Sequence, residues 1–368
     1  MNECQGQIID STFPFAIFLG PNSCKSCDID YNDDVLCYGY RSCLLATKIY
    51  TSTNNIECRS EESCRRAGSI SSDKTLICSG PHSCANVDSI ESREGNIKGS
   101  GHFAMYMAKS IIAQRDVTCE GESSCAVTSI SSNKNIYCDG YDVCRGSNLT
   151  STHITCDGLS ACKRTMIYAR QNLYLHGSLV AESSFITAKN IHGYGSFAGS
   201  VIDSMDLNRM DITLQAYRSG YNSDIICRSG ARCHLQCRYS GCVSTRFNCL
   251  TGSICTVDAG NCTNSISEIN GISCPSVTRS NSQKQDEDIL NMVKFNFEQY
   301  IKKMDSNDIN EKESFNFDDK IIETEKHRLY TITIVCFILS AIFGIICFYL
   351  QCNKSKITKM DDEYTSLL

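Results

Sequence analysis

The feature that most constrains this chain is a unit of about twenty residues that recurs along most of its length. One unit contains an apolar residue, a spacer, a cysteine, five further residues, a second cysteine and then Ile-x-Ser, as in 56–72. A single unit of this kind cannot bury its own apolar side chains, so the repeat predicts that units stack on one another. The eight Cys-x5-Cys pairs are Cys37/Cys43, Cys58/Cys64, Cys78/Cys84, Cys119/Cys125, Cys138/Cys144, Cys156/Cys162, Cys227/Cys233 and Cys249/Cys255.

Units without a cysteine pair fill the gaps in this series. Gly99 and Met105 stand in the two cysteine places of one unit, and the segment 163–226 contains no cysteine at all. About thirteen units therefore lie between Phe18 and Cys255. The units of the Cys-free segment are marked by Leu173/Leu175 with Ile186, by His192-Gly193 with Ile202 and, more loosely, by Ile212/Leu214.

Two short patterns with a period of two residues lie in each unit. The first is apolar-x-Cys, as in Ile56/Cys58, and the second is apolar-x-small, as in Ile70/Ser72. Alternation is the strand period, so each pattern predicts a short strand with both named residues facing inward. We therefore expect a mainly β fold, a parallel β-solenoid of about 20-residue turns. At about 4.8 Å per turn the solenoid is a rod roughly 55–60 Å long.

The chain has 26 cysteines, a density that favours disulfides in an oxidising compartment. Zinc sites use Cys-x2-Cys or histidine partners at set spacing, and neither pattern accompanies these pairs. We expect each Cys-x5-Cys pair to close on itself after the first strand, although the same sequence permits bridges between stacked turns. Seven further cysteines in this region, an odd number, have no assigned partner: 4, 24, 27, 237, 242, 262 and 274.

The chain divides into five segments by composition. Residues 1–17 lack the basic and apolar regions of a signal peptide, so either the natural start lies upstream or the membrane segment directs insertion. Residues 18–274 form the Cys-rich solenoid ectodomain. Residues 275–328 form a charged stalk, in which apolar residues at helical spacing between 289 and 304 predict an amphipathic helix. Residues 329–350 form the transmembrane helix, and residues 351–368 the cytoplasmic tail.

The membrane segment 329–350 is apolar and uncharged, and it is long enough to span a bilayer. A disulfide-bonded solenoid belongs outside the cytosol, so the C-terminal tail faces the cytosol. The tail is similar to two sorting signals that share Leu367: a Tyr-x-x-hydrophobic signal at Tyr364 and an acidic dileucine signal with Glu363 and Leu368. Adaptor proteins of the clathrin type are the expected partners, and plasma and endosomal membranes the expected location.

No catalytic motif stands out along the chain. The one acidic cluster that resembles a glycan-cleaving site is Asp203, Asp206, Arg209 and Asp211, and a solvated loop is the simpler interpretation. We expect no cofactor and no metal. The net charge of −6 gives no electrostatic reason to expect nucleic acid, which is bound by basic patches. Asn148 and Asn261 begin glycosylation sequons, and the sequon at Asn353 falls in the cytosolic tail.

Turns of the form Cys-x-Gly-x-x-Ser/Ala-Cys, as in 78–84 and 156–162, resemble the Cys-rich parallel β-helix ectodomains of protist surface membrane proteins. The resemblance covers 18–274 and implies the fold, but it carries no activity to any residue. The Cys-free middle departs from the pattern. Our hypothesis is a type I membrane protein with a non-catalytic ectodomain for surface recognition, adhesion or cargo binding of an extracellular protein or glycan. The alternatives are a membrane-tethered polysaccharide lyase or hydrolase and a purely structural coat protein.

Overall fold

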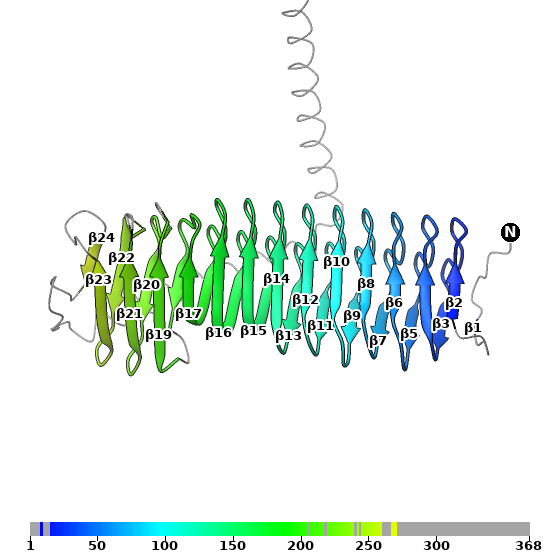
Figure 1. Cartoon of the computed structure of the whole chain (residues 1–368), viewed down its shortest axis with the longest axis horizontal. Coiled ribbons are helices and arrows are strands. Elements are labelled where there is room, and N and C mark those ends of the chain that lie inside the picture. Colours follow the sequence, from blue (N-terminus) through cyan, green and yellow to red (C-terminus); the bar gives the residue numbers. More distant parts are fainter. Residues whose placement is uncertain are drawn as a thin grey trace, which may run out of the picture. The chain divides into compact units, whose positions relative to one another are not determined.

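The computed structural model describes residues 8–9, 15–204, 207–216, 219–238, 241–242, 244–259 and 266–270. Their 24 strands pair in parallel and form a solenoid of about 12 turns, as Figure 1 shows. No helix occurs among these residues. The parallel β-solenoid with turns of about 20 residues is thus confirmed.

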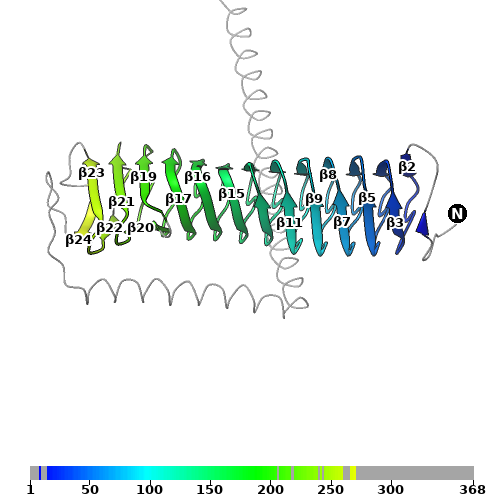
Figure 2. The ribbon, with the colours of Figure 1, turned by 90° about the horizontal axis from the view of Figure 1, so that it is seen from below.

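Each turn contributes one strand to each of two stacks, which lie on opposite sides of the rod (Figures 1 and 2). The cysteine stack carries the apolar-x-Cys pattern. It contains β2 (Phe15–Phe18), β4 (Asp34–Cys37), β6 (Ile56–Cys58), β8 (Leu76–Ser79), β10 (Ile97–Ser100), β12 (Val117–Glu120) and β14 (Asn135–Asp139), the second halves of β15 (Asn148–Asp157), β16 (Met166–His176) and β17 (Phe185–Gly193), and then β19 (Arg209–Leu214), β21 (Arg232–Cys237) and β23 (Ile254–Ala259).

The serine stack carries the apolar-x-small pattern. It contains β1 (Ile8–Ile9), β3 (Asp28–Tyr31), β5 (Lys48–Thr51), β7 (Ser69–Ser72), β9 (Ser89–Ser92), β11 (Ser110–Ala113) and β13 (Ser129–Ser132), the first halves of β15, β16 and β17, and then β18 (Val201–Asp203), β20 (Asp224–Cys227), β22 (Thr245–Cys249) and β24 (Ile266–Asn270). In β15, β16 and β17 one continuous strand serves both stacks.

The core consists of columns of like side chains that face inward. Ile49 pairs in register with Ile70, and Ile70 pairs with Ile90 and lies with it in the fully buried interior. The small residues two places later form a second buried column, in which Ser72 pairs with Thr51. The predicted inward positions are confirmed, because alternation along a strand and equal turn lengths together fix which side chains meet.

The turn after a cysteine-stack strand is here called the cysteine corner, and from β2 to β16 it is held in a left-handed backbone conformation at alternate residues. The second cysteine of each regular pair has φ between +52° and +54° (Cys43, Cys64, Cys84, Cys125, Cys144 and Cys162). This conformation costs a non-glycine residue about 1–2 kcal/mol. Its backbone N–H donates to the preceding turn, at 2.9 Å from Cys64 to Ser42. The ladder of hydrogen bonds therefore continues through the corner and holds that conformation.

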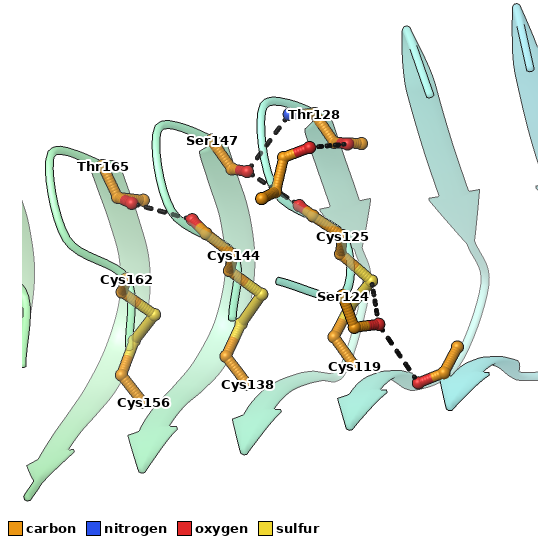
Figure 3. Close-up of a disulfide and its surroundings, with 12 residues drawn as sticks. Cys119, Ser124, Cys125, Thr128, Cys138, Cys144, Ser147, Cys156, Cys162 and Thr165 are labelled. Atoms are coloured by element: carbon orange, nitrogen blue, oxygen red, sulfur yellow. Dashed lines mark hydrogen bonds between the residues drawn. A yellow bond between two sulfur atoms is a disulfide. The ribbon is translucent and has the colours of Figure 1, made fainter. Parts of the chain in front are cut away.

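Disulfides and hydroxyl groups fill this corner (Figure 3). In three consecutive turns a disulfide joins the strand to the corner: Cys119–Cys125, Cys138–Cys144 and Cys156–Cys162. The hydroxyl of Ser147 donates to the carbonyl of Cys125 at 2.9 Å, and that of Thr165 donates to the carbonyl of Cys144 at 2.9 Å. Buried carbonyl groups that face away from a strand ladder thus gain a partner from the next turn.

The glycine of the Cys-x-Gly motif is required by both conformation and space. Gly158 has φ +115°, a region that side chains disfavour. A Cβ atom at this position would lie 2.4 Å from the carbonyl oxygen of Gly140 in the preceding turn. Glycines therefore stack on glycines at the entrance of the cysteine corner, which explains why the motif recurs.

The turns without a disulfide fill the same volume with other side chains. A Cβ on Gly99 would lie 2.2 Å from Cε of Met105, so the thioether occupies the space of a disulfide. In another turn, a Cβ on Gly193 would lie 2.8 Å from Cε1 of Phe197. Met105 and Phe197 are fully buried. The assignment of Gly99 and Met105 to the cysteine places is confirmed.

At the polar corner, where each serine-stack strand passes into the next cysteine-stack strand, amide and carboxylate side chains form a ladder. Asn190 Nδ2 donates to Asn172 Oδ1 at 2.7 Å, and Asn135 Nδ2 donates to Asp116 Oδ1 at 2.7 Å. Asn172 in turn lies 3.1 Å from Nδ1 of His153. Ladders of this kind satisfy side-chain polar groups along a stack, and they fix its register.

Candidate functional site

Because inward positions are occupied by packing, any site on the solenoid must be built from outward side chains. On the cysteine stack, β16, β17 and the residue directly after β17 present a two-by-two array of rings, here called the aromatic quartet: Tyr174, His176, His192 and Tyr194. The Tyr174 and His192 rings stack at 5.0 Å and 14°, and the His176 and Tyr194 rings at 4.8 Å and 7°. The register Tyr174↔His192 produces this arrangement.

The quartet is partly open to solvent. Tyr194 is 43% exposed, whereas Tyr174, His176 and His192 are half-buried by one another and by the strands. Burial lowers the pKa of His192 below its usual value of 6.5, so its imidazole is neutral at neutral pH. The quartet is therefore an apolar surface edged with hydroxyl and imidazole groups, which is the chemistry of a recognition surface.

The outward rows beside the quartet continue with small and acidic residues. Tyr174 is in register with Thr155, and Thr155 is in register with Tyr137, which is 42% exposed. In the parallel row His176 is in register with Asp157, an exposed carboxylate. An exposed aspartate, Asp139, is in register with Asp157. Aromatic and carboxylate side chains thus lie together on one face of four consecutive turns.

A second group of rings lies at the cysteine corner of two other turns. His82 stacks on Phe103 at 5.1 Å, and His102 and Tyr106 meet Phe103 edge to face at 4.1 Å and 5.0 Å. Burial lowers the pKa of His82, and the positive charges of Arg65 and His102 act in the same direction. In this cluster three rings surround Phe103, whereas the quartet is an open array of two stacked pairs.

The eight predicted disulfide pairs all close within their own Cys-x5-Cys unit, and one further disulfide joins Cys237 to Cys242. The location predicted for these bridges, the turn after the first strand of each unit, holds for the six pairs between Cys37 and Cys162.

The predicted location is wrong for the last two pairs, Cys227–Cys233 and Cys249–Cys255. Cys227 and Cys249 end the serine-stack strands β20 and β22. Cys233 lies near the start of β21 and Cys255 near the start of β23, in register with one another on the cysteine stack. Cys233 therefore does not lie in a cysteine corner as predicted, and both bridges close the polar corner instead. The physical reason is the register of the strands. Cys233 is paired with Met210 inside β19, whereas the second cysteine of a regular pair lies in the corner after the strand.

Cys237–Cys242 takes the place of the regular bridges at the cysteine corner. Cys237 is in register with Leu214, which holds the first cysteine place of its turn. Leu235-Gln-Cys237 has the apolar-x-Cys pattern, so the signal was present in the sequence. It was missed because the two cysteines are separated by four residues instead of five. Cys24 and Cys27 are buried, whereas Cys4, Cys262 and Cys274 lie outside the described residues.

Three cysteine sulfurs lie close enough to suggest a metal site. Those of Cys37, Cys58 and Cys64 are within 4.8 Å of one another. All three belong to disulfides in adjacent turns, and a disulfide sulfur is not a thiolate ligand. The proximity therefore reflects the stacking of two bridges.

The described residues of the acidic cluster, Asp203, Arg209 and Asp211, do not come together as one site. Asp203 is fully buried and receives two hydrogen bonds from Arg228, at 2.8 Å and 2.6 Å. Asp211 instead accepts a hydrogen bond from Arg209 at 2.8 Å, and Asp206 lies outside the described residues. The two carboxylates are therefore engaged in separate ion pairs. Replacing Asp203 would remove the two hydrogen bonds that its buried carboxylate accepts from Arg228, so a loss of stability would accompany any functional effect.

Other predicted features fall in different parts of the chain. Asn148 is half-buried at the start of β15, in register with Ser129 and Met166, and its glycosylation stays a prediction. Asn261, the amphipathic helix, the segment 329–350 and the sorting residues Glu363, Tyr364, Leu367 and Leu368 lie outside the described residues. Over the described part of the chain, no helix has the length and apolar character needed to cross a membrane.

Comparisons of the chain with known families, proteins and structures found no match. No protein-family model, no curated protein and no solved structure matches it.

Proposed function

We propose that the solenoid is a recognition module on the non-cytosolic side of a membrane, in a single-pass protein whose C-terminal tail directs endocytic sorting. The observation that carries this proposal is the set of nine disulfides within the described residues. Disulfides at this density persist in oxidising compartments and are rare in the cytosol. The apolar segment 329–350 supports a membrane anchor.

Recognition is favoured over the other roles by the outward rows. The aromatic quartet and Tyr137 gather rings on one face, whereas outward positions elsewhere include ion pairs, such as Lys98 with Glu120 at 2.8 Å, and single apolar side chains, such as Ile112. A purely structural rod has no need of such a surface. The polysaccharide-cleaving alternative draws no support from Asp203 and Asp211, which are held in separate ion pairs.

The test is the topology of the full chain in cells. Surface biotinylation of intact cells should label solenoid lysines such as Lys109, which is exposed, and non-reducing mass spectrometry should find its cysteines oxidised. Lys356 and Lys359 in the tail should be labelled only after permeabilisation. Labelling of the tail lysines on intact cells, or a reduced set of solenoid cysteines, would contradict the proposal.

A further inference from the structure

We infer that the outward face of β14 to β17 binds a neutral sugar ring of a glycan, at the position of Thr155 between Tyr137 and Tyr174. This inference deepens the proposed recognition function and rests on it. It depends on the register of three consecutive pairings: Tyr137↔Thr155, Thr155↔Tyr174 and Tyr174↔His192.

The first step is the spacing of the rings along the rod. Neighbouring strands are about 4.8 Å apart, so Tyr137 and Tyr174, two turns apart, are separated by about 9.6 Å. Tyr174 stacks on His192 on its other side, at 5.0 Å. The ring ladder that continues from Tyr174 to His192 is thus interrupted at Thr155, where the side chain is short. A ring placed at this position would lie about 4.8 Å from each tyrosine, a usual stacking distance.

The second step is the shape of the surface next to Thr155. The Tyr174 and His176 rings lie side by side on β16, with centroids 6.4 Å apart and planes 20° apart. Both rings are in register with small or short side chains of the preceding turn, Thr155 and Asp157. A sugar ring has an apolar face of C–H groups that packs against an aromatic ring, and hydroxyl groups at its edge that need polar partners.

The third step is the charge and hydrogen-bonding capacity at the edge. Asp139 and Asp157 are exposed carboxylates in register with one another and with His176. Carboxylates accept hydrogen bonds from sugar hydroxyl groups, and they repel a uronic acid or a sulfated sugar. The surface therefore suits a neutral sugar and disfavours an anionic one.

The last step is the rigidity of the surface. β15, β16 and β17 are continuous strands of 10, 11 and 9 residues that serve both stacks. The rings of Tyr137, Tyr174 and His192 are held on strands, and not on a loop, so little ordering is needed when a ligand binds.

The experiment uses the full chain, purified in a mild detergent, and three soluble probes: chitohexaose, mannohexaose and hexagalacturonate. Binding is measured by calorimetry and by tyrosine fluorescence, which no tryptophan obscures. We expect one of the neutral probes to bind, hexagalacturonate to bind at least about tenfold more weakly, and Tyr174→Ala to weaken neutral binding about tenfold.

Two matched variants separate the site from the fold. Tyr168→Ala changes the same residue type on the same strand, but on the serine stack, and should leave binding unchanged. Thr155→Tyr should keep the solenoid folded, since a tyrosine there continues the ring ladder, and it should abolish binding by occupying the position of the sugar.

The inference is overturned if neither neutral probe binds, if hexagalacturonate binds best, or if Thr155→Tyr binds as well as the wild type. Each of these results leaves the topology measurement untouched, so failure of the sugar site is distinguishable from failure of the proposed function. A cytosolic, reduced solenoid would instead overturn the proposed function itself.

Discussion

The interrupted disulfide column offers a direct test of how this solenoid is packed. In the turn of Gly99 and Met105, the strand is in register with cysteines on both sides, Gly99 with Cys78 and with Cys119. Met105 has φ +53°, close to the +52° of Cys84 and the +54° of Cys125. The backbone therefore already has the geometry of a disulfide turn. We predict that Gly99→Cys with Met105→Cys forms a disulfide that continues the column.

The two single variants should both be less stable than the wild type. Gly99→Cys adds a Cβ that would lie 2.2 Å from Met105 Cε, and overpacking of this kind costs about 1–3 kcal/mol. Met105→Cys empties part of a fully buried volume, for which a cost of about 2–3 kcal/mol is expected. In the double variant the steric conflict disappears, and closing a seven-residue loop contributes up to about 2.4 kcal/mol. The two changes are thus strongly non-additive.

The assay combines non-reducing mass spectrometry with hydrogen exchange of the amides in 97–113. Hydrogen exchange is preferred to a single melting temperature because stacked turns need not unfold all together. The double serine variant Gly99→Ser with Met105→Ser has similar volume and no bond, so it should exchange faster than the wild type. If the double cysteine variant stays reduced, or exchanges faster than both single variants, the equivalence of this turn with its neighbours is refuted.

Three further predictions follow from named contacts. Ser83→Ala removes a buried hydroxyl that donates to the Cys58 carbonyl at 2.7 Å, so it should cost about 1–3 kcal/mol in urea unfolding, whereas Ser69→Ala on the outward side of β7 should change stability by less than about 0.5 kcal/mol. Burial lowers the pKa of His82, Arg65 and His102 lower it further, and Glu62 and Glu61 oppose the shift, so the unfolded chain binds the proton more readily than the folded chain. The contribution of His82 to the free energy of unfolding should be complete above pH 6.5 and should fall as the pH drops below that value. His82→Asn should reduce this pH dependence, as measured by hydrogen exchange. In the tail, Leu367→Ala removes a residue shared by both sorting patterns and should block internalisation in a surface uptake assay, whereas Tyr364→Ala should leave the dileucine route open; unchanged uptake for Leu367→Ala would contradict the tail assignment.

The inward half of this fold was predictable from sequence, since burial acts on every turn in the same way. Ile56, Ile70 and Ile90 recur at nearly equal intervals, and alternation then decides which neighbours face the core. Even Met105 could be assigned to a cysteine place, because Ile97 and Ile111 on either side of it keep the regular spacing of the repeat.

The corner closed by the last cysteine pairs was not predictable from spacing alone. Cys227 follows Ile225 in an apolar-x-Cys pattern identical to that of the regular units, and Cys233 stands at the regular distance after it. The structure pairs Ile225 with Ile202, which places this pattern on the serine stack. A span of five residues bridges either corner equally well, so only the register carried through the Cys-free segment distinguishes them.

The outward rows follow a different logic, because their residues can be read from the sequence but their neighbours cannot. Tyr174 and His192 are separated by 18 residues and Tyr137 and Thr155 also by 18. Because these side chains face outward, they are brought together only through the register of the buried residues beside them, such as Leu173 with Ile191. That register passes two β-bulges, one between Ser151 and His153 and one between Ala169 and Asn172. Both bulges lie where the polar corner shortens until one strand serves both stacks. The shortened corner therefore produces the long strands, whereas the register of the cysteine stack, which is the same in turns with a longer corner, aligns the rings.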